Sequence, residues 1–277
     1  MMSLIRGPFS RRDSPTYNKV CGRQNGFQPT TMPHPRFPVE LLDYIVDHLY
    51  DVRDALESCC LVSTSWIPRT RRHLFAKVAF RSENDLQSWK NMFPDPFTSP
   101  ACYTDHLVIY CPEAVTPADA EERGWIPTFS RVVRFDMDFD GPEISLLPFY
   151  GFSPSLRSLQ ICYSSFPFPR ILNFIHSFPL VNDLSLISCG DDPIEDIDGP
   201  HATVQPPLTG CLELFVQDGM DYIVSRLFSS QNSLYFRKLD LELAYEVDIL
   251  VVLALVERCR FTLESFKVDI GRYRMSV

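Results

Sequence analysis

A spaced apolar pattern that recurs along most of the sequence constrains the fold more than any other feature. Each copy has an apolar residue, two others, a second apolar residue, one other and a third apolar residue, as in Leu156–Ile161. Successive copies between positions 104 and 263 start 24 to 28 residues apart. Such a period indicates a stack of similar structural units. The copies are Val132, Phe135 and Met137; Leu156, Leu159 and Ile161; Val181, Leu184 and Leu186; Phe236, Leu239 and Leu241; and Leu263, Phe266 and Val268; two weaker copies, with Thr in the first apolar position, are Thr104, Leu107 and Ile109, and Thr209, Leu212 and Leu214.

Each copy predicts one short β-strand. The last two apolar residues of a copy lie two positions apart, so both point to the same, inward side of a strand. Apolar helical segments are expected between the strands, at residues 171–175, 222–228 and 247–258. Stacked units of this kind form a parallel sheet with helices on the convex side.

These units resemble leucine-rich repeats in period and pattern. The asparagine that usually follows each strand in that family is absent, and Cys111, Ser164 and Cys189 occupy roughly that region. We therefore predict an α/β protein with an irregular leucine-rich-repeat solenoid over residues 81–277 and an acidic loop insertion at 190–207. An unrelated α/β fold with a parallel sheet remains an alternative. No capping repeat is evident near Val277, which indicates a truncated array.

A second feature, at residues 37–80, predicts three short helices. Leu42, Ile45, Val46 and Leu49 recur at helical spacing and form one apolar stripe. Leu56, Cys59 and Cys60 form a second, short stripe, and Ser63 or Thr64 is expected to cap a third helix that holds Trp66 and Leu74, with Pro68 in its first turn. About 40 residues bury too little apolar area to fold well alone, so such a unit needs a partner or a docked neighbour.

The order of these residues resembles the F-box motif. That family opens with Leu-Pro, continues with Glu-Leu, Ile and Leu at helical spacing, and ends with Val-(Ser/Cys)-Lys-x-Trp and Leu-Trp. Departures here are Phe37 for Leu, Thr64 for Lys, Phe75 for Trp and an unusual Pro68. An ordinary helical subdomain with a core Trp is the alternative. The matching residues are Phe37-Pro38, Glu40-Leu41-Leu42, Ile45, Leu49, Val62-Ser63, Trp66 and Leu74-Phe75.

The two resemblances together imply a substrate receptor of a Skp–cullin–F-box ubiquitin ligase. In that family the F-box docks on a Skp-type adaptor, and through it on a cullin, while the C-terminal repeats hold a protein substrate. The receptor itself is not catalytic and needs no cofactor or metal. A repeat scaffold outside ubiquitination, or a Cys/His- or Asp-based enzyme, are the alternatives. By resemblance the adaptor-binding residues are Phe37, Pro38, Leu41, Leu42, Ile45, Leu49, Val62 and Trp66.

The composition points to a cytoplasmic or nuclear protein. The nine cysteines include no Cys-x-x-Cys pair, which argues against a disulfide framework and a zinc module. The longest apolar run, Ile249 to Val256, is far shorter than the ~20 residues of a membrane span. Residues 1–36 are basic and proline-rich, which predicts a disordered leader, whereas the rest of the chain is acidic. An acidic body repels phosphates, so we expect no nucleic-acid partner and no membrane partner.

Strand alternation also predicts which residues of the sheet face solvent. Seven of these positions are acidic and three are basic, which favours a basic protein substrate. Large side chains among them could anchor a partner, although a solvated strand face without a ligand remains an alternative. The candidate substrate-binding residues are Tyr110, Asp136, Asp138, Ile187, Glu213, Phe215, Asp240 and Glu242.

Other motifs are weak. Residues 191–199 are acid-rich, but their spacing does not match a helix-loop-helix calcium loop and predicts a solvated insertion. Asp136, Asp138 and Asp140 share one strand face without a histidine partner nearby in the sequence. The sequence contains no Walker loop, dinucleotide fingerprint, Gly-x-Ser-x-Gly elbow or His-Glu-x-x-His motif.

Overall fold

The computed structural model describes residues 38–139, 146–150, 154–163, 168–188, 207–216, 223–224, 227, 234–243 and 249–270. The predicted leader, the predicted insertion at 190–207 except its last residue, Phe37 and Asp140 lie outside these residues.

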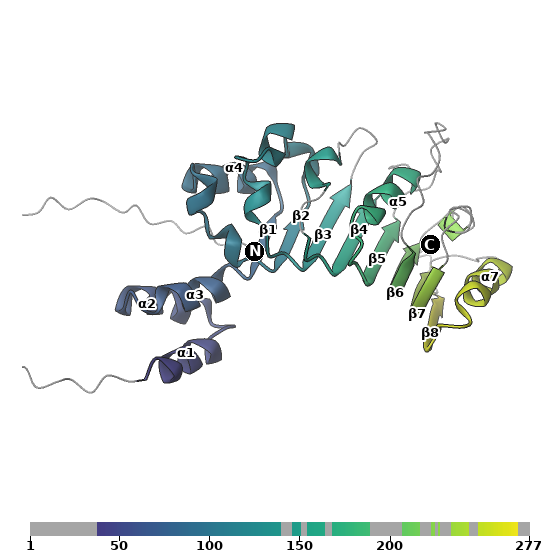
Figure 1. Ribbon diagram of the computed structural model, residues 1–277, viewed down its shortest axis with the longest axis horizontal. Helices are drawn as coiled ribbons and strands as arrows, with labels where there is room; N and C mark the ends of the chain where they lie inside the picture. The colour runs from purple at the N-terminus through teal and green to yellow at the C-terminus, as the bar shows by residue number, and fades with distance from the viewer. Residues whose placement is uncertain are drawn as a thin grey trace, which may run out of the picture. The chain divides into compact units, whose positions relative to one another are not determined.

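The protein is an α/β protein built on one parallel sheet. Eight strands pair in the order in which they occur in the chain, and every pairing is parallel. Figure 1 shows them side by side from β1 to β8. The strands are β1 (Lys77–Phe80), β2 (His106–Ile109), β3 (Arg134–Phe139), β4 (Ser158–Tyr163), β5 (Asp183–Ser188), β6 (Leu208–Val216), β7 (Leu234–Leu243) and β8 (Ser265–Ile270).

The strand register aligns the repeated apolar pattern across the sheet. Leu159 of β4 lies opposite Phe135 of β3 and Leu184 of β5, and the same row continues through Leu212 and Leu239. All five side chains are at most 2% exposed. The predicted inward register is therefore confirmed for these strands.

A second repeated feature precedes the strands. The carbonyl of Asp105 accepts hydrogen bonds from the backbone N–H groups of Val133 and Arg134, at 2.8 and 3.0 Å. The carbonyl of Val133 in turn accepts from Arg157 and Ser158, at 2.8 and 2.9 Å. This shared acceptor locks each strand to the start of the next one, so neighbouring units keep a common register.

The shared-acceptor arrangement changes at Gly210 in β6. Its φ is 88°, and a Cβ built there would lie 2.0 Å from the carbonyl oxygen of Asn182. Only glycine tolerates this backbone and this close approach. The pairing with β7 also shifts here: Gly210 lies opposite Phe236 and Cys211 lies opposite Lys238, so Arg237 is the extra residue of a β-bulge.

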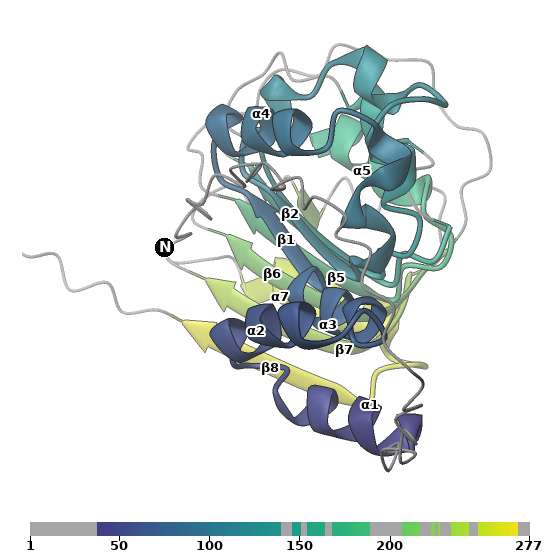
Figure 2. The ribbon, with the colours of Figure 1, turned by 90° about the vertical axis from the view of Figure 1, so that its left-hand side faces the viewer.

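The core lies between the inward side of the strands and the helices that connect them. In α5, Ile171, Phe174 and Ile175 recur at helical spacing and are at most 1% exposed. In α7, Val252 and Leu255 join the same core. Figures 1 and 2 show α4 and α5 on the same side of the sheet. These helices are α4 (Glu83–Met92), α5 (Phe168–His176) and α7 (Ile249–Cys259).

Short 3₁₀ helices, most of them with proline in their first turn, make many of the remaining connections. Proline is tolerated there because the first N–H groups of a helix have no partner within it. They are η1 (Pro96–Thr98), η2 (Pro100–Tyr103), η3 (Pro112–Ala114), η4 (Pro117–Ala120), η5 (Ile126–Thr128) and η6 (Leu147–Phe149).

Three helices precede β1, as predicted: α1 (Val39–His48), α2 (Arg53–Val62) and α3 (Ile67–Leu74). The expected capping of α3 by Ser63 or Thr64 is wrong. The helix begins after Trp66, which makes no side-chain cap, and the Ser63 hydroxyl accepts from the N–H of Ser65 in the preceding turn instead. Pro68 does lie in the first turn of α3.

Two predicted orientations in the sheet are also wrong. Phe266 was expected in the core but is 45% exposed, because β8 is the last strand of the described sheet and no further unit packs against it. Strand alternation predicts that Val108, between the inward residues Leu107 and Ile109, faces solvent, but it is 2% exposed; it lies in register between Ala79 of β1 and Asp136 of β3.

Candidate functional site

An exposed apolar surface covers α1, α2 and the turn between them. Its side chains range from 47% exposed at Ile45 to 82% at Leu61. A surface helix normally turns such side chains toward a core, so their exposure here leaves apolar surface that a partner could cover. We call this surface the apolar helix face; it comprises Val39, Leu41, Tyr44, Ile45, Tyr50, Val52, Leu61 and Val62.

The opposite side of the same helices is packed. Val46 and Leu56 are each 1% exposed, and Cys59 is 7% exposed. The buried hydroxyl of Thr70 donates to the carbonyl of Trp66 at 2.8 Å, which satisfies it within α3. The three helices therefore bury one side and leave the apolar helix face uncovered.

A charged cluster fastens α1 to α3. The carboxylate of Asp47 accepts from Nε of Arg69 at 2.6 Å and lies 2.7 Å from Nε2 of His73, and a second Arg69 nitrogen completes a bidentate pair. The hydrogen bonds from Arg69 and His73 hold the pKa of Asp47 well below its usual range. The cluster fixes the orientation of α1, which carries much of the apolar helix face.

The residues predicted to bind the adaptor fall into two groups. Pro38, Leu41, Ile45 and Val62 are exposed, so they are open to a partner. By contrast, Leu42, Leu49 and Trp66 are half-buried and belong partly to the packing of the helices. Phe37 lies outside the described residues.

Sequence reasoning missed several members of the apolar helix face, among them Tyr44 and Leu61. Tyr44 lies in the same helical turn as Leu41 and Ile45, so the spacing of α1 contained the signal. Leu61 lies beside Val62 in the last turn of α2, so its exposure depends on the position at which α2 ends.

On the outward side of the sheet, the candidate substrate-binding residue Asp136 takes part in a cross-strand network. Asp136 lies 2.8 Å from Nε2 of His106 and 3.0 Å from Nε of Arg134, which also donates to Gln160. Burial raises the pKa of Asp136, but hydrogen bonds from His106 and Arg134 outweigh it and leave the pKa lowered. No histidine lies near this aspartate in the sequence, but the register of β2 and β3 brings His106 beside it.

Cations offset much of the negative charge farther along the sheet as well. Lys238 lies 3.9 Å from both Glu213 and Asp240, and Lys267 lies 3.3 Å from Asp240. Glu242 is exposed and has no ion-pair partner among the described residues. The attraction of this surface for a basic substrate is therefore weaker than a count of its acids predicts.

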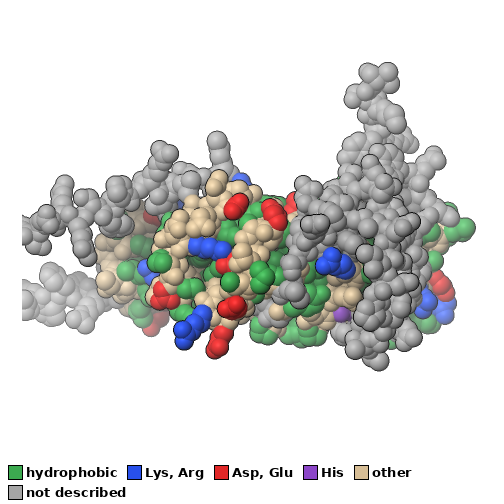
Figure 3. All heavy atoms as spheres, turned by 90° about the horizontal axis from the view of Figure 1, so that it is seen from above, with side chains coloured by type: hydrophobic (Ala, Val, Ile, Leu, Met, Phe, Trp, Pro, Cys, Tyr) green, Lys and Arg blue, Asp and Glu red, His purple; other side chains and the backbone are tan. Residues whose placement is uncertain are grey.

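The remaining candidate substrate-binding residues are spread over several strands. Tyr110 follows β2 and is 51% exposed, whereas Asp138 of β3, Ile187 of β5 and Phe215 of β6 are half-buried. They share the outward side of the sheet but form no single cluster with Asp136. Figure 3 is seen from above, the side on which α4 and α5 lie in Figure 1, and on that face acidic, basic and apolar side chains are interspersed over the visible part of the described chain.

Within the described ranges, no group of three or more His, Cys, Asp or Glu side chains could hold a metal ion. The described helices are all too short or too polar to span a membrane. Comparisons with family models, with curated proteins and with solved structures found no match for this chain.

Proposed function

We propose that this protein is the substrate-recognition subunit of a Skp–cullin–F-box ubiquitin ligase. The observation that carries the proposal is the apolar helix face, which lies within the segment whose residue order resembles an F-box. Eight large apolar side chains are exposed between Val39 and Val62, on α1, α2 and the turn between them, where Val46, Leu56 and Cys59 are already buried. Exposed apolar side chains gathered in a short segment are typical of an interaction site.

The division of roles follows from the two parts of the chain. The apolar helix face binds a Skp-type adaptor and, through it, a cullin. The eight-stranded parallel sheet, with one strand per repeat and a shared backbone acceptor between units, supports the proposal of an irregular leucine-rich-repeat solenoid. Its outward surface holds the substrate, and the ligation chemistry belongs to other subunits of the complex.

Binding of the full chain to a purified Skp-type adaptor tests this role. The variant Leu41→Asp/Ile45→Asp places two charges on the apolar helix face at positions that are 51% and 47% exposed, so the fold should survive. Each anchor typically contributes ~2–4 kcal/mol, so the adaptor affinity should fall at least about 100-fold.

A matched control uses the same chemistry elsewhere. Leu250→Asp/Leu253→Asp changes two leucines of α7 that are 66% and 54% exposed and should leave adaptor binding unchanged. Failure of the wild-type chain to bind the adaptor, or equal loss of binding by both double variants, would contradict the proposal and favour a repeat scaffold outside ubiquitination.

A further inference from the structure

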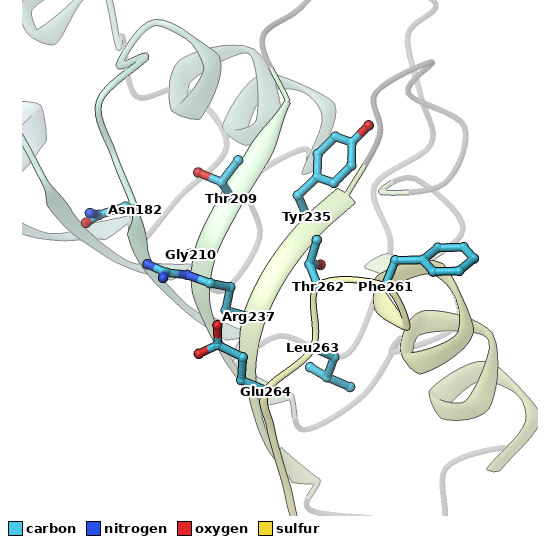
Figure 4. A pocket seen from close by; sticks show the side chains of 9 residues that line it. All are labelled: Asn182, Thr209, Gly210, Tyr235, Arg237, Phe261, Thr262, Leu263 and Glu264. Carbon is cyan, nitrogen blue, oxygen red and sulfur yellow. The ribbon is translucent and has the colours of Figure 1, made fainter.

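A pocket of about 580 Å³ opens at the start of strands β6, β7 and β8. Figure 4 shows the side chains around it, which come from these strands and from the segments just before β5 and β8. The lining residues that matter for its chemistry are Asn182, Gly210, Tyr235, Arg237, Phe261 and Glu264.

Two features of β6 and β7, the glycine at position 210 and the β-bulge at Arg237, shape the pocket. Gly210 has no side chain to fill the space, and its φ of 88° with the 2.0 Å approach to Asn182 allows no other residue without strain. The adjacent β-bulge adds Arg237 to the edge of the pocket. Bulges commonly redirect a side chain toward a binding site.

Arg237 differs from Lys238 of the same strand, Lys267 of β8 and Arg134 of β3. Lys238 and Lys267 each lie within 4 Å of an acid on the sheet, as does Arg134 on β3. In the described part of the chain, the exposed guanidinium of Arg237 has no ion pair and no side-chain hydrogen bond. It therefore keeps all of its donors for a ligand, and a guanidinium binds a carboxylate through two parallel hydrogen bonds.

The other walls restrict what the ligand can be. Tyr235 is 46% exposed and Phe261 is 86% exposed, although the guanidinium of Arg260 lies 4.4 Å from the centre of the Phe261 ring; each ring leaves apolar surface open at the edge of the pocket. Figure 4 shows the carboxylate of Glu264 extending toward the Arg237 side chain. This nearby negative charge repels a dianion more strongly than a singly charged carboxylate.

We propose that this pocket binds a peptide segment in which an acidic side chain, Asp or Glu, stands next to an apolar one. The carboxylate pairs with Arg237, and the apolar side chain packs against Tyr235 and Phe261. The proposal names a substrate feature for the receptor and so rests on the proposed function. The carboxylate comes from a side chain of the peptide rather than from its C-terminus, because an internal segment of a folded partner presents the former.

Three peptide libraries test the proposal by fluorescence anisotropy on the full chain. The first contains labelled nonapeptides with both ends blocked and a central Glu-Leu pair among varied flanking residues. The second replaces the central Glu by Gln, and the third combines Gln with a free C-terminal carboxylate. A fourth arm replaces Glu by phosphoserine in the best binder from the first library.

The variants Arg237→Gln and Lys238→Gln make a matched pair, because each removes one positive charge and the positions are adjacent. We expect the first library to contain binders, Arg237→Gln to weaken them by about tenfold or more and Lys238→Gln by less than about twofold. The phosphoserine peptide should bind more weakly than its Glu parent because of Glu264.

Several results would overturn the proposal: no binder in the first library at a Kd below about 1 mM, equal binding by the Gln library, preferred binding of the free C-terminus or of phosphoserine, or equal effects of the two variants. Adaptor binding by Arg237→Gln is measured alongside. If Arg237→Gln retains adaptor binding but loses peptide binding, the result supports the pocket as the peptide-binding site. Absence of adaptor binding in the wild-type chain would count against the receptor role but not against peptide binding.

Discussion

The three N-terminal helices and the parallel sheet contain similar apolar residues, but the sheet buries them and the helices leave many of them exposed. In the sheet, the row from Phe135 to Leu239 is at most 2% exposed, and helices such as α5 cover it. In α1 and α2, only Val46, Leu56 and Cys59 are buried, and eight large apolar side chains on these helices and the turn between them remain uncovered. The apolar content of the sheet stabilises the chain, whereas much of that in α1 and α2 is available to a partner.

An apolar stripe in a helix therefore does not by itself indicate whether it belongs to the core or to a binding surface. The stripe predicted in the first helix comprises Leu42, Ile45, Val46 and Leu49, yet Val46 alone of these is buried and Ile45 is 47% exposed. Helical spacing identifies a common face but does not tell whether a core or a partner covers it.

The largest expected effect lies in the sheet. Leu184→Ala removes a side chain that is 2% exposed and packed in the central row, so it should lower the free energy of unfolding by ~2–5 kcal/mol. Ser185→Ala, its half-buried neighbour on the outward side, should change it by less than ~0.5 kcal/mol. Urea unfolding of both variants measures this, and the reverse order would show that the inward and outward sides are exchanged.

Gly210→Ala should have the next largest effect. A side chain there meets the carbonyl of Asn182 and requires a strained backbone, so the variant should lose ~1–3 kcal/mol of stability. Thr209→Ala is the control, since Thr209 is exposed and should matter by less than ~0.5 kcal/mol. Equal urea midpoints for wild type and Gly210→Ala would show that the bulge in β6 and β7 is not rigid.

A smaller, pH-dependent effect is expected at the junction of α1 and α3. The pKa of Asp47 is lower in the folded chain than in the unfolded chain, so its pairing stabilises the fold at neutral pH and is lost as the pH falls into the acid range. Because the Asp47 and Arg69 side chains are each 34% exposed, the effect is at most about 1 kcal/mol.

The variant Asp47→Asn tests the size and sign of this contribution to the free energy of unfolding. Its stability should fall below that of the wild type at pH 7, and the gap should begin to narrow only once the pH falls below about 4, the ordinary pKa of an Asp carboxyl, and should keep narrowing toward the lowered pKa of Asp47. Urea unfolding at several pH values provides the measurement, and a constant gap at all pH values would mean that the charge of Asp47 is not responsible.

The smallest effect on stability is expected on the apolar helix face itself. Ile45→Asp should change the free energy of unfolding by less than ~0.5 kcal/mol, because the side chain is 47% exposed. Thermal unfolding followed by circular dichroism suffices to measure it. A large loss would place Ile45 in a core and remove the distinction between the two regions.

Much of the sheet was predictable, because its signal is repeated. The alignment of Leu159, Leu184 and Leu239 and their burial follow from the period of the pattern and from strand alternation. Phe266 shows the limit of that reasoning, because a repeat at the end of the described sheet has the same pattern but no next unit to cover it.

The less predictable features depend on contacts between different units. The pairing of His106 with Asp136 requires the register of two strands, and the beginning of α3 at Ile67 depends on a turn rather than on a capping residue. The pocket beside Gly210 arises from a β-bulge, which shifts the pairing by one residue without leaving a periodic signal in the sequence.

Hydrogen exchange of the full chain, with and without a purified Skp-type adaptor, tests whether the apolar helix face is the adaptor-docking surface. We expect adaptor binding to slow amide exchange across residues 39–62 and to leave the exchange of β3 to β7 unchanged, because the adaptor covers the apolar helix face and the sheet is already packed. Protection that appears on the strands instead, or no protection in α1 and α2 at saturating adaptor, would contradict it.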